Sequence, residues 1–354
     1  MILDIFVPLF FFLNDVNTHI KNYKTNKYYV PLEHFLKKED LEKIEKKLQI
    51  QSILAEMNSL LLLDNYQDFS KKLDILKTYP EAESYYLYYL AVFETKQKNY
   101  IKSRMYLEQS ISLNPDFDPA WNLLGYIQSI NFDYENALKS FQKAVLLNRF
   151  HPVYCFNLAK TYYLVNETSK ALNEIQRCIK MRDNYGEFFY LKGLILEKSS
   201  PEQALESYYE ALNRNFQHEE FLVSYFELSL KHQNTKSIAK LIDVTKNSRL
   251  PIMIVLRFQA FIRFGEIENA SKEFFNMFLN HFKTEKEFQE IQTKITEDVK
   301  KFYCANTKEF LLFVNQNQKH LQKYKLDFLQ EAQNATCPQI IPITPKDPIV
   351  QPAL

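Results

Sequence analysis

Small residues recur in this chain at a fixed interval of 34 residues, and that interval constrains the fold more than any other feature of the sequence. The first row of small residues consists of Ala91, Gly125, Ala159 and Gly193. A second row keeps the interval except at its last member, which falls one residue early, and consists of Ser103, Ala137, Ala171 and Ala204. A period of this length predicts tandem copies of one small structural unit.

Bulky residues keep the same interval between the small ones. One row consists of Leu87, Trp121, Cys155 and Phe189, and another of Leu107, Phe141, Ile175 and Tyr208. A third set of smaller residues consists of Ser110, Ala144, Cys178 and Ala211. Alternating small and large positions of this kind predict two antiparallel helices per unit, with small residues where the helix axes cross most closely.

The segment Asp118 to Arg149 carries the most complete version of the pattern. Its matching positions are Trp121, Leu124, Gly125, Ala137, Phe141 and Ala144. These residues and spacings resemble a tetratricopeptide repeat. The resemblance implies an all-α fold, a right-handed superhelical solenoid of antiparallel helix pairs with C-terminal capping helices.

The same register predicts how the chain is divided. We expect an N-terminal apolar segment and linker over 1–30, N-terminal helices with a candidate degenerate repeat over 31–83, and a repeat array over 84–284. The predicted units are 84–117, 118–151, 152–185, 186–218, a degenerate unit over 219–250, and 251–284. Capping helices are predicted over 285–335, where an apolar stripe at helical spacing ends with Val299 and Phe302. A proline-rich, disordered tail is predicted over 336–354.

Composition argues against several classes of function. The chain has 4 glycines and 13 prolines, too few glycines for phosphate-binding loops, and a formal charge of +1, which does not favour a nucleic-acid partner. Zincin, nucleotide-loop and nucleophile-elbow motifs do not occur in the sequence. We therefore predict no enzyme activity, no cofactor and no metal, and we keep an enzyme with an unrecognised site as the weakest alternative.

The four cysteines form no Cys-x-x-Cys pair and have no histidine at a metal-ligand spacing, so the sequence indicates neither a zinc site nor a disulfide framework. We expect ordinary thiols. Cys155 and Cys178 fall in core rows of the repeat, where a buried packing role is expected.

The segment from Ile2 to Leu13 is apolar apart from Asp4 and has the length of a signal-peptide core. It has no basic residues before it and no small-residue cleavage site after it. A buried N-terminal segment or a misplaced start codon is favoured, with a signal or anchor as the alternative. The predicted location is cytoplasmic, or else exported or membrane-associated through residues 2–13.

In the family that the chain resembles, the first helices of the pairs line a concave groove that binds a peptide or a helix. At the corresponding positions here we expect a peptide-binding groove formed by Tyr85, Tyr88, Asn122, Tyr126, Phe156, Lys160, Tyr163 and Tyr190, with Glu187 beside them. Tyrosine suits such a surface, because its ring gives contact area and its hydroxyl can hydrogen-bond a peptide backbone. The alternative is that some of these rings pack between helices in a chain with 23 Tyr and 29 Phe.

The predicted function is therefore a non-catalytic scaffold or adaptor that binds an apolar or aromatic peptide or helix of a protein partner. The basic side chains that some members of the family use to hold a terminal carboxylate are missing, since the corresponding places carry residues such as Tyr88, Val92 and Leu123. A membrane-associated envelope-assembly factor with an N-terminal anchor or signal is the alternative.

Overall fold

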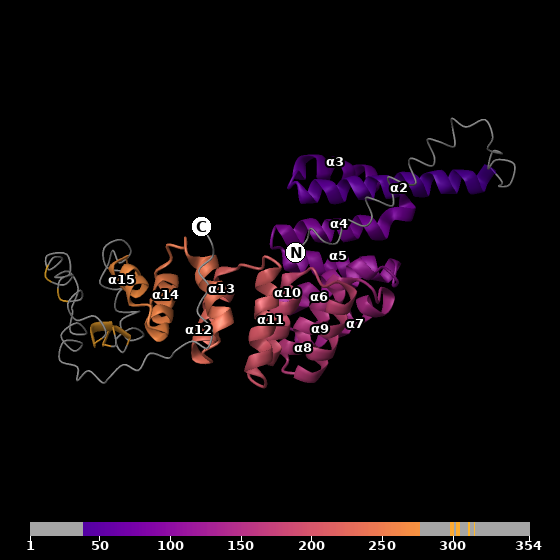
Figure 1. The fold of residues 1–354 in the computed structure, drawn as a ribbon. Coiled ribbons are helices and arrows are strands. Elements are labelled where there is room, and N and C mark those ends of the chain that lie inside the picture. The colour runs from indigo at the N-terminus through magenta and orange to yellow at the C-terminus, as the bar shows by residue number, and fades with distance from the viewer. Residues whose placement is uncertain (1–37, 277–297, 301, 305–310, 312–314, 316–354) are drawn as a thin grey trace, which may run out of the picture. The chain divides into compact units, whose positions relative to one another are not determined.

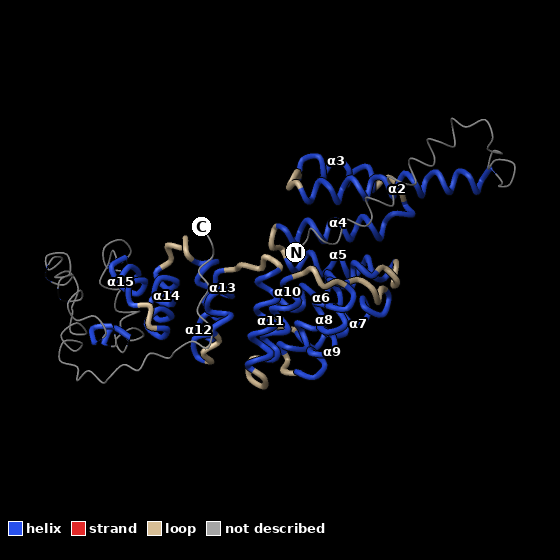
Figure 2. Tube along the Cα trace, viewed as in Figure 1, coloured by secondary structure: helices blue, strands red, loops and turns tan. Residues whose placement is uncertain are grey.

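The computed structural model describes residues 38–276, 298–300, 302–304, 311 and 315. Within these residues the regular structure is helical, with short loops between the helices and no strand (Figure 2). The predicted N-terminal segment, the proline-rich tail and most of the predicted capping region lie outside the described residues.

The chain divides into two compact units, Met1–Asp183 and Asn184–Leu354. The described part of unit 1 contains four helix pairs, which follow one another along the chain in Figure 1. They are α2 (Lys38–Leu62) with α3 (Tyr66–Leu76), α4 (Glu83–Lys96) with α5 (Tyr100–Leu113), α6 (Asp118–Ile130) with α7 (Tyr134–Leu147), and α8 (Pro152–Leu164) with α9 (Thr168–Met181). A short 3-10 turn, η3 (Pro80–Ala82), precedes α4.

The described part of unit 2 contains three further pairs. They are α10 (Gly186–Leu196) with α11 (Pro201–Asn213), α12 (Glu219–Lys231) with α13 (Thr235–Thr245), and α14 (Pro251–Phe264) with α15 (Ile267–Asn276). In every pair of both units the two helices pack against each other. The prediction of an all-α repeat fold built from helix pairs is confirmed.

The turn inside a pair uses the same backbone conformation again and again. Asp64, Lys98, Phe132 and Asn166, spaced by 34 residues, all have a positive φ, between 51° and 63°. After each such residue the next amide closes the first helix, as where the N–H of Asp133 donates to the carbonyl of Gln128 at 2.9 Å. This is the left-handed helix stop that usually contains glycine. The interval includes Asp64, so the pair α2/α3 shares the register of the pairs that follow it.

The helices of a pair cross where a small residue faces a large one. A Cβ atom added to Gly125 of α6 would lie 2.8 Å from ring atoms of Phe141 in α7, closer than real Cβ contacts allow. Gly193 of α10 meets the ring of Tyr208 in the same way. The pair α4/α5 has the larger Ala91 and, at the place of the aromatic ring, the smaller Leu107. The summed volume at the crossing is therefore held roughly constant.

The pair α12/α13 departs from this rule, which explains why its sequence looks degenerate. Tyr225 and Phe226, both fully buried, occupy the region where α4, α6, α8 and α10 carry glycine or alanine. The second helix of this pair, α13, carries the small residue Ser237 opposite them, and its hydroxyl lies 2.8 Å from the hydroxyl of Tyr225. The crossing is thus filled from the opposite side.

The pair α14/α15 also packs against residues that follow it along the chain. Val299 and Phe302, which end the apolar stripe predicted to cap the array, are fully buried. The ring of Phe302 lies 5.7 Å from that of Phe258 and 5.1 Å from that of Phe274. The pair is also tied by Arg257, which is 2% exposed and donates to both carboxylate oxygens of Glu273.

The prediction that Cys155 and Cys178 are ordinary thiols is wrong. The two residues are fully buried, their Cα atoms are 5.8 Å apart, and their sulfurs form a disulfide between α8 and α9. The search for short Cys-x-x-Cys spacings missed the bond, because antiparallel helices bring together residues that are 23 positions apart. The signal was nevertheless present in the two rows that contain Cys155 and Cys178.

Because the summed volume at the crossing is roughly constant, the effect of Gly125→Ala on the free energy of unfolding should depend on the residue at position 141. Alone, Gly125→Ala should lower the free energy of unfolding by about 1 kcal/mol, because the overlap with Phe141 outweighs the better helix propensity of alanine. In a Phe141→Leu background the same change should be neutral or stabilising, because it recreates the combination of Ala91 and Leu107. Urea unfolding of the four proteins measures both effects, and equal effects of Gly125→Ala in the two backgrounds would contradict the rule.

Candidate protein-binding face

The first helices of consecutive pairs in unit 1 pack on one another, α4 against α6 and α6 against α8. The 34-residue interval places Tyr88, Asn122 and Phe156 at equivalent positions of these three helices. We call the surface formed by the predicted groove residues of α4, α6 and α8 the inner face. Its residues are Tyr85, Tyr88, Asn122, Tyr126, Phe156, Lys160 and Tyr163.

An amide bridge fixes the register between two of these helices. Asn157 of α8 donates from Nδ2 to Oδ1 of Asn122 in α6 at 2.9 Å. Asn122 is 7% exposed, so its carbonyl oxygen would lose a hydrogen bond without easy access to water if the bridge were removed. The bridge therefore holds α6 and α8 together from the side of the inner face.

Two of the predicted groove residues do not project freely from this face. Tyr88 is 6% exposed and packs edge-on against Phe117 and Tyr89, at ring distances of 5.1 and 5.2 Å. Burial raises the pKa of its phenol well above the ordinary value. Asn122 is buried by its amide bridge. Both residues contribute to packing between helices, which is the alternative that the aromatic content of the chain left open.

The other members of the inner face in unit 1 are at least partly exposed, although Tyr85 also packs edge-on against Phe117 at 5.0 Å. Tyr85, Tyr126, Phe156 and Tyr163 are partly exposed, and Lys160 is exposed. Burial, and to a smaller extent the neighbouring Tyr100, raise the pKa of Tyr126, which favours the neutral hydroxyl that can donate a hydrogen bond. The face thus offers aromatic rings from three successive helices with one cation among them.

Tyr190, the last predicted groove residue, lies on α10 in unit 2. Its ring packs against Phe216 at 5.0 Å and Phe221 at 5.2 Å, and lies 6.0 Å from that of Tyr208. It belongs to an aromatic cluster within unit 2 and is partly exposed there, as is Glu187.

A feature that the sequence reasoning missed lies beside Tyr85. The helix α2 carries Lys43, Lys46 and Lys47 on the side that faces a cavity next to this tyrosine. The signal was available in the sequence, since residues three and four positions apart share one face of a helix. It was not predicted because the predicted groove residues begin with Tyr85, after α2.

The chemistry of the inner face is that of contact and hydrogen bonding. Within the described residues, no group of three or more His, Cys, Asp and Glu side chains is arranged so that it could hold a metal ion.

The amide bridge leads to a stability prediction. Asn157→Ala should lower the free energy of unfolding by about 1 to 2 kcal/mol, because it leaves the buried Asn122 amide unsatisfied. Once Asn122→Ala is present, Asn157→Ala should cost much less, and chemical unfolding of both single variants and the double variant gives the coupling energy. A coupling energy of zero would mean that the bridge does not hold the two helices.

Comparison with known proteins identifies one of the helix pairs. The family model described as "Tetratricopeptide repeat" matches residues 118–151. Anaphase-promoting complex subunit 3 of Schizosaccharomyces pombe is 26% identical over 113 residues, which make up 32% of this chain and 17% of that protein. The chain therefore matches only a small part of that relative's length.

Among solved structures, pilF of Pseudomonas aeruginosa is 15% identical with a TM-score of 0.48, covering 60% of this chain and 98% of that one. A tetratricopeptide repeat protein from Parabacteroides merdae is 16% identical with a TM-score of 0.43, covering 71% and 98%. The family match at residues 118–151 coincides with the pair α6/α7, and the pairs around it keep the same register. This chain thus contains a tetratricopeptide repeat at residues 118–151.

Proposed function

We propose that this protein is a scaffold or adaptor whose unit 1 binds a segment of another protein on the inner face. Repeat proteins of this kind generally mediate protein interactions through the surface formed by stacked units. The observation that carries the proposal is the set of partly exposed rings on successive first helices, Tyr85, Tyr126, Phe156 and Tyr163.

The kind of partner follows from the side chains. Rings with few rotatable bonds lose little conformational entropy on binding, and they favour apolar or aromatic side chains opposite them. The hydroxyls of Tyr126 and Tyr163 suit the backbone of an extended peptide or the polar edge of a helix. Family members are generally non-catalytic, and the proposed role is accordingly one of assembly.

A capture experiment tests this role. The variant Tyr126→Ala, Phe156→Ala, Tyr163→Ala should lose at least about tenfold in affinity for the protein that the unaltered chain captures from a native lysate, because central aromatic residues carry much of the energy of such interfaces. The captured protein is identified by mass spectrometry, and its affinity is then measured with purified components.

The matched control removes three exposed apolar side chains elsewhere, in the variant Phe132→Ala, Leu146→Ala, Phe150→Ala, where the original residues are 79%, 76% and 80% exposed. Circular dichroism and thermal melting establish that both variants remain folded. Equal capture by the inner-face variant, or loss of capture in the control alone, would move the binding surface away from the inner face.

The disulfide favours one of the two locations left open by the sequence. We propose that the protein resides in an oxidising compartment, because disulfides persist there and are rare where thiols are kept reduced. The bond between Cys155 and Cys178 lies in the core of a helix pair and not at an exposed site. No described helix has the length and apolarity needed to cross a membrane.

Thiol trapping in intact cells tests this location. Cells are treated with a permeant maleimide before lysis, and after reduction a second, heavier maleimide labels the thiols released from disulfides. We expect Cys155 and Cys178 to carry the second label in peptide mass spectrometry. If both carry the first label after denaturation in its presence, the protein resides in a reducing compartment, as the sequence alone suggested.

A further inference from the structure

The helix α2 is longer than the first helices of the pairs that follow it in unit 1. The helix α2 has 25 residues, whereas α4, α6 and α8 have 14, 13 and 13. The left-handed turn residues Asp64 and Lys98 lie at equivalent positions, so the ends of α2 and α4 are in register. The additional residues of α2 therefore all lie at its N-terminal end, beyond the length that a repeat of this register requires.

This additional part of α2 forms one wall of a cavity. The cavity has a volume of about 390 Å³ and is bounded on the other side by Glu81 of η3 and Tyr85 of α4. Lys43, Lys46 and Lys47 line it from α2. We call it the lysine pocket.

Deeper along α2 the lining becomes apolar. Ile50, which is 6% exposed, and Leu54 follow the lysines at helical spacing on the same side of the helix. The turn before η3 is held against α2, since the hydroxyl of Tyr79 donates to Oε1 of Gln49 at 3.3 Å. The lysine pocket thus has an apolar base and a charged rim.

The side chains that line the pocket carry a surplus of positive charge, while Glu39, Glu42 and Glu45 of the same helix lie outside the lining. The ammonium groups of Lys43, Lys46 and Lys47 are exposed and make no ion pair with a described residue. By contrast, Lys72 of α3 forms an ion pair with Glu56 of α2. The lining contains one carboxylate, Glu81, against three lysines. A concave site with this balance attracts negative charge.

We propose that the lysine pocket receives acidic side chains of the same partner segment that lies on the inner face. This inference rests on the proposed function. Tyr85 belongs to both surfaces, so a peptide can pass from the pocket onto the inner face without leaving the protein. The occupant is a peptide in which aspartate or glutamate residues adjoin apolar or aromatic ones.

The same observations argue against a nucleic acid as the occupant. Nucleic-acid sites are built from a long stripe or patch of basic residues, whereas this chain has a net charge of +1 and the pocket has an apolar base. Lysine rims that adjoin apolar surface fit an acidic and apolar peptide better, because both parts of the peptide find a complementary partner.

Two fluorescent peptides of equal length test the proposal by anisotropy with the full chain. In one, a run of glutamates precedes phenylalanine and leucine residues, and in the other glutamine replaces each glutamate. We expect the glutamate peptide to bind about tenfold more tightly at low salt, since exposed ion pairs each contribute modestly and three act together. The variant Lys43→Gln, Lys46→Gln, Lys47→Gln should abolish this difference, and added salt should reduce it.

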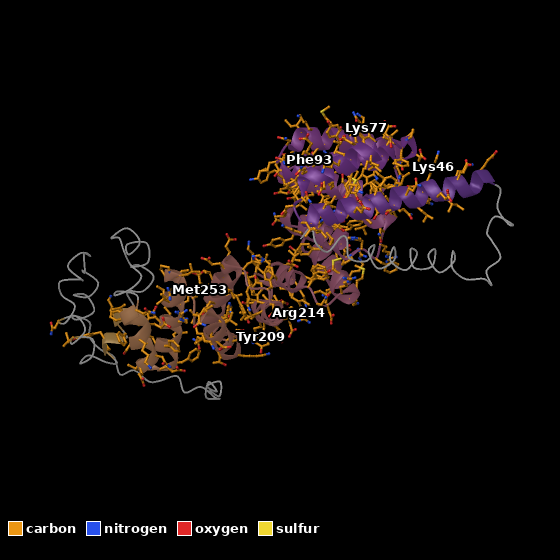
Figure 3. The ribbon with its side chains drawn as sticks, turned by 90° about the horizontal axis from the view of Figure 1, so that it is seen from above. Lys46, Lys77, Phe93, Tyr209, Arg214 and Met253 are labelled. Carbon is orange, nitrogen blue, oxygen red and sulfur yellow. A yellow bond between two sulfur atoms is a disulfide. The ribbon has the colours of Figure 1, made fainter. Side chains whose placement is uncertain are left out.

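A matched control removes the same number of charges elsewhere, in the variant Lys77→Gln, Lys102→Gln, Lys180→Gln. Lys46 and Lys77 lie on different parts of unit 1 (Figure 3). The control should keep the preference for glutamate. Equal binding of the two peptides to the unaltered chain, no binding of either peptide, or a preference that survives in the α2 variant would overturn the proposal.

Further comparisons separate this proposal from the one on which it rests. The inner-face variant Tyr126→Ala, Phe156→Ala, Tyr163→Ala should weaken both peptides by a similar factor. If the inner-face variant binds both peptides as tightly as the unaltered chain, while the α2 variant still loses the preference for glutamate, then the proposed function of the inner face is wrong and the lysine pocket binds the acidic peptide by itself. If heparin competes more strongly than the glutamate peptide, the pocket is a general polyanion site and the proposal is overturned.

Discussion

The pairs from α4/α5 to α10/α11 depend on one contact, the close crossing of the two helices, where a small residue of the first helix meets a larger one of the second. At α6/α7 the absence of a side chain on Gly125 allows the ring of Phe141 to lie directly against the helix backbone. This contact sets the spacing within a pair. Stacked pairs then bury their remaining apolar surface against each other, and the first helices come to share one face. The accessibility of Tyr126 and Phe156 thus depends on contacts made on the opposite side of their helices.

The crossing was predictable from the sequence, because glycine and phenylalanine sixteen positions apart leave a recognisable pattern at Gly125 and Phe141. The disulfide was not predicted, although Cys155 and Cys178 stood in known rows, because the two rows had not been related to each other in space. Their pairing follows from the antiparallel arrangement itself. What was lacking was the lateral alignment of the two helices, which depends on the turn between them.

The candidate site was predictable in outline only. The 34-residue interval identifies which positions share a face, but the exposure of each side chain depends on neighbours outside that row. Phe117, from the loop before α6, covers Tyr88, and Asn157 covers Asn122. The lysine pocket has no counterpart in the repeat, since it arises where α2 continues past the end of the pattern. A repeat interval in the sequence predicts only features that recur in every unit, and the additional part of α2 does not recur.

The left-handed turn inside the pairs has a further consequence. Its geometry is held by amide and carbonyl groups, and residues as different as Asp64, Lys98 and Phe132 occupy it. The residue type at this position can therefore vary, while the left-handed turn stays at the same place in each pair. The phase of the helix pairs can accordingly be followed in the torsion angles where the side chains no longer show it. By that measure the pair α2/α3 keeps the same phase as the three pairs that follow it in unit 1.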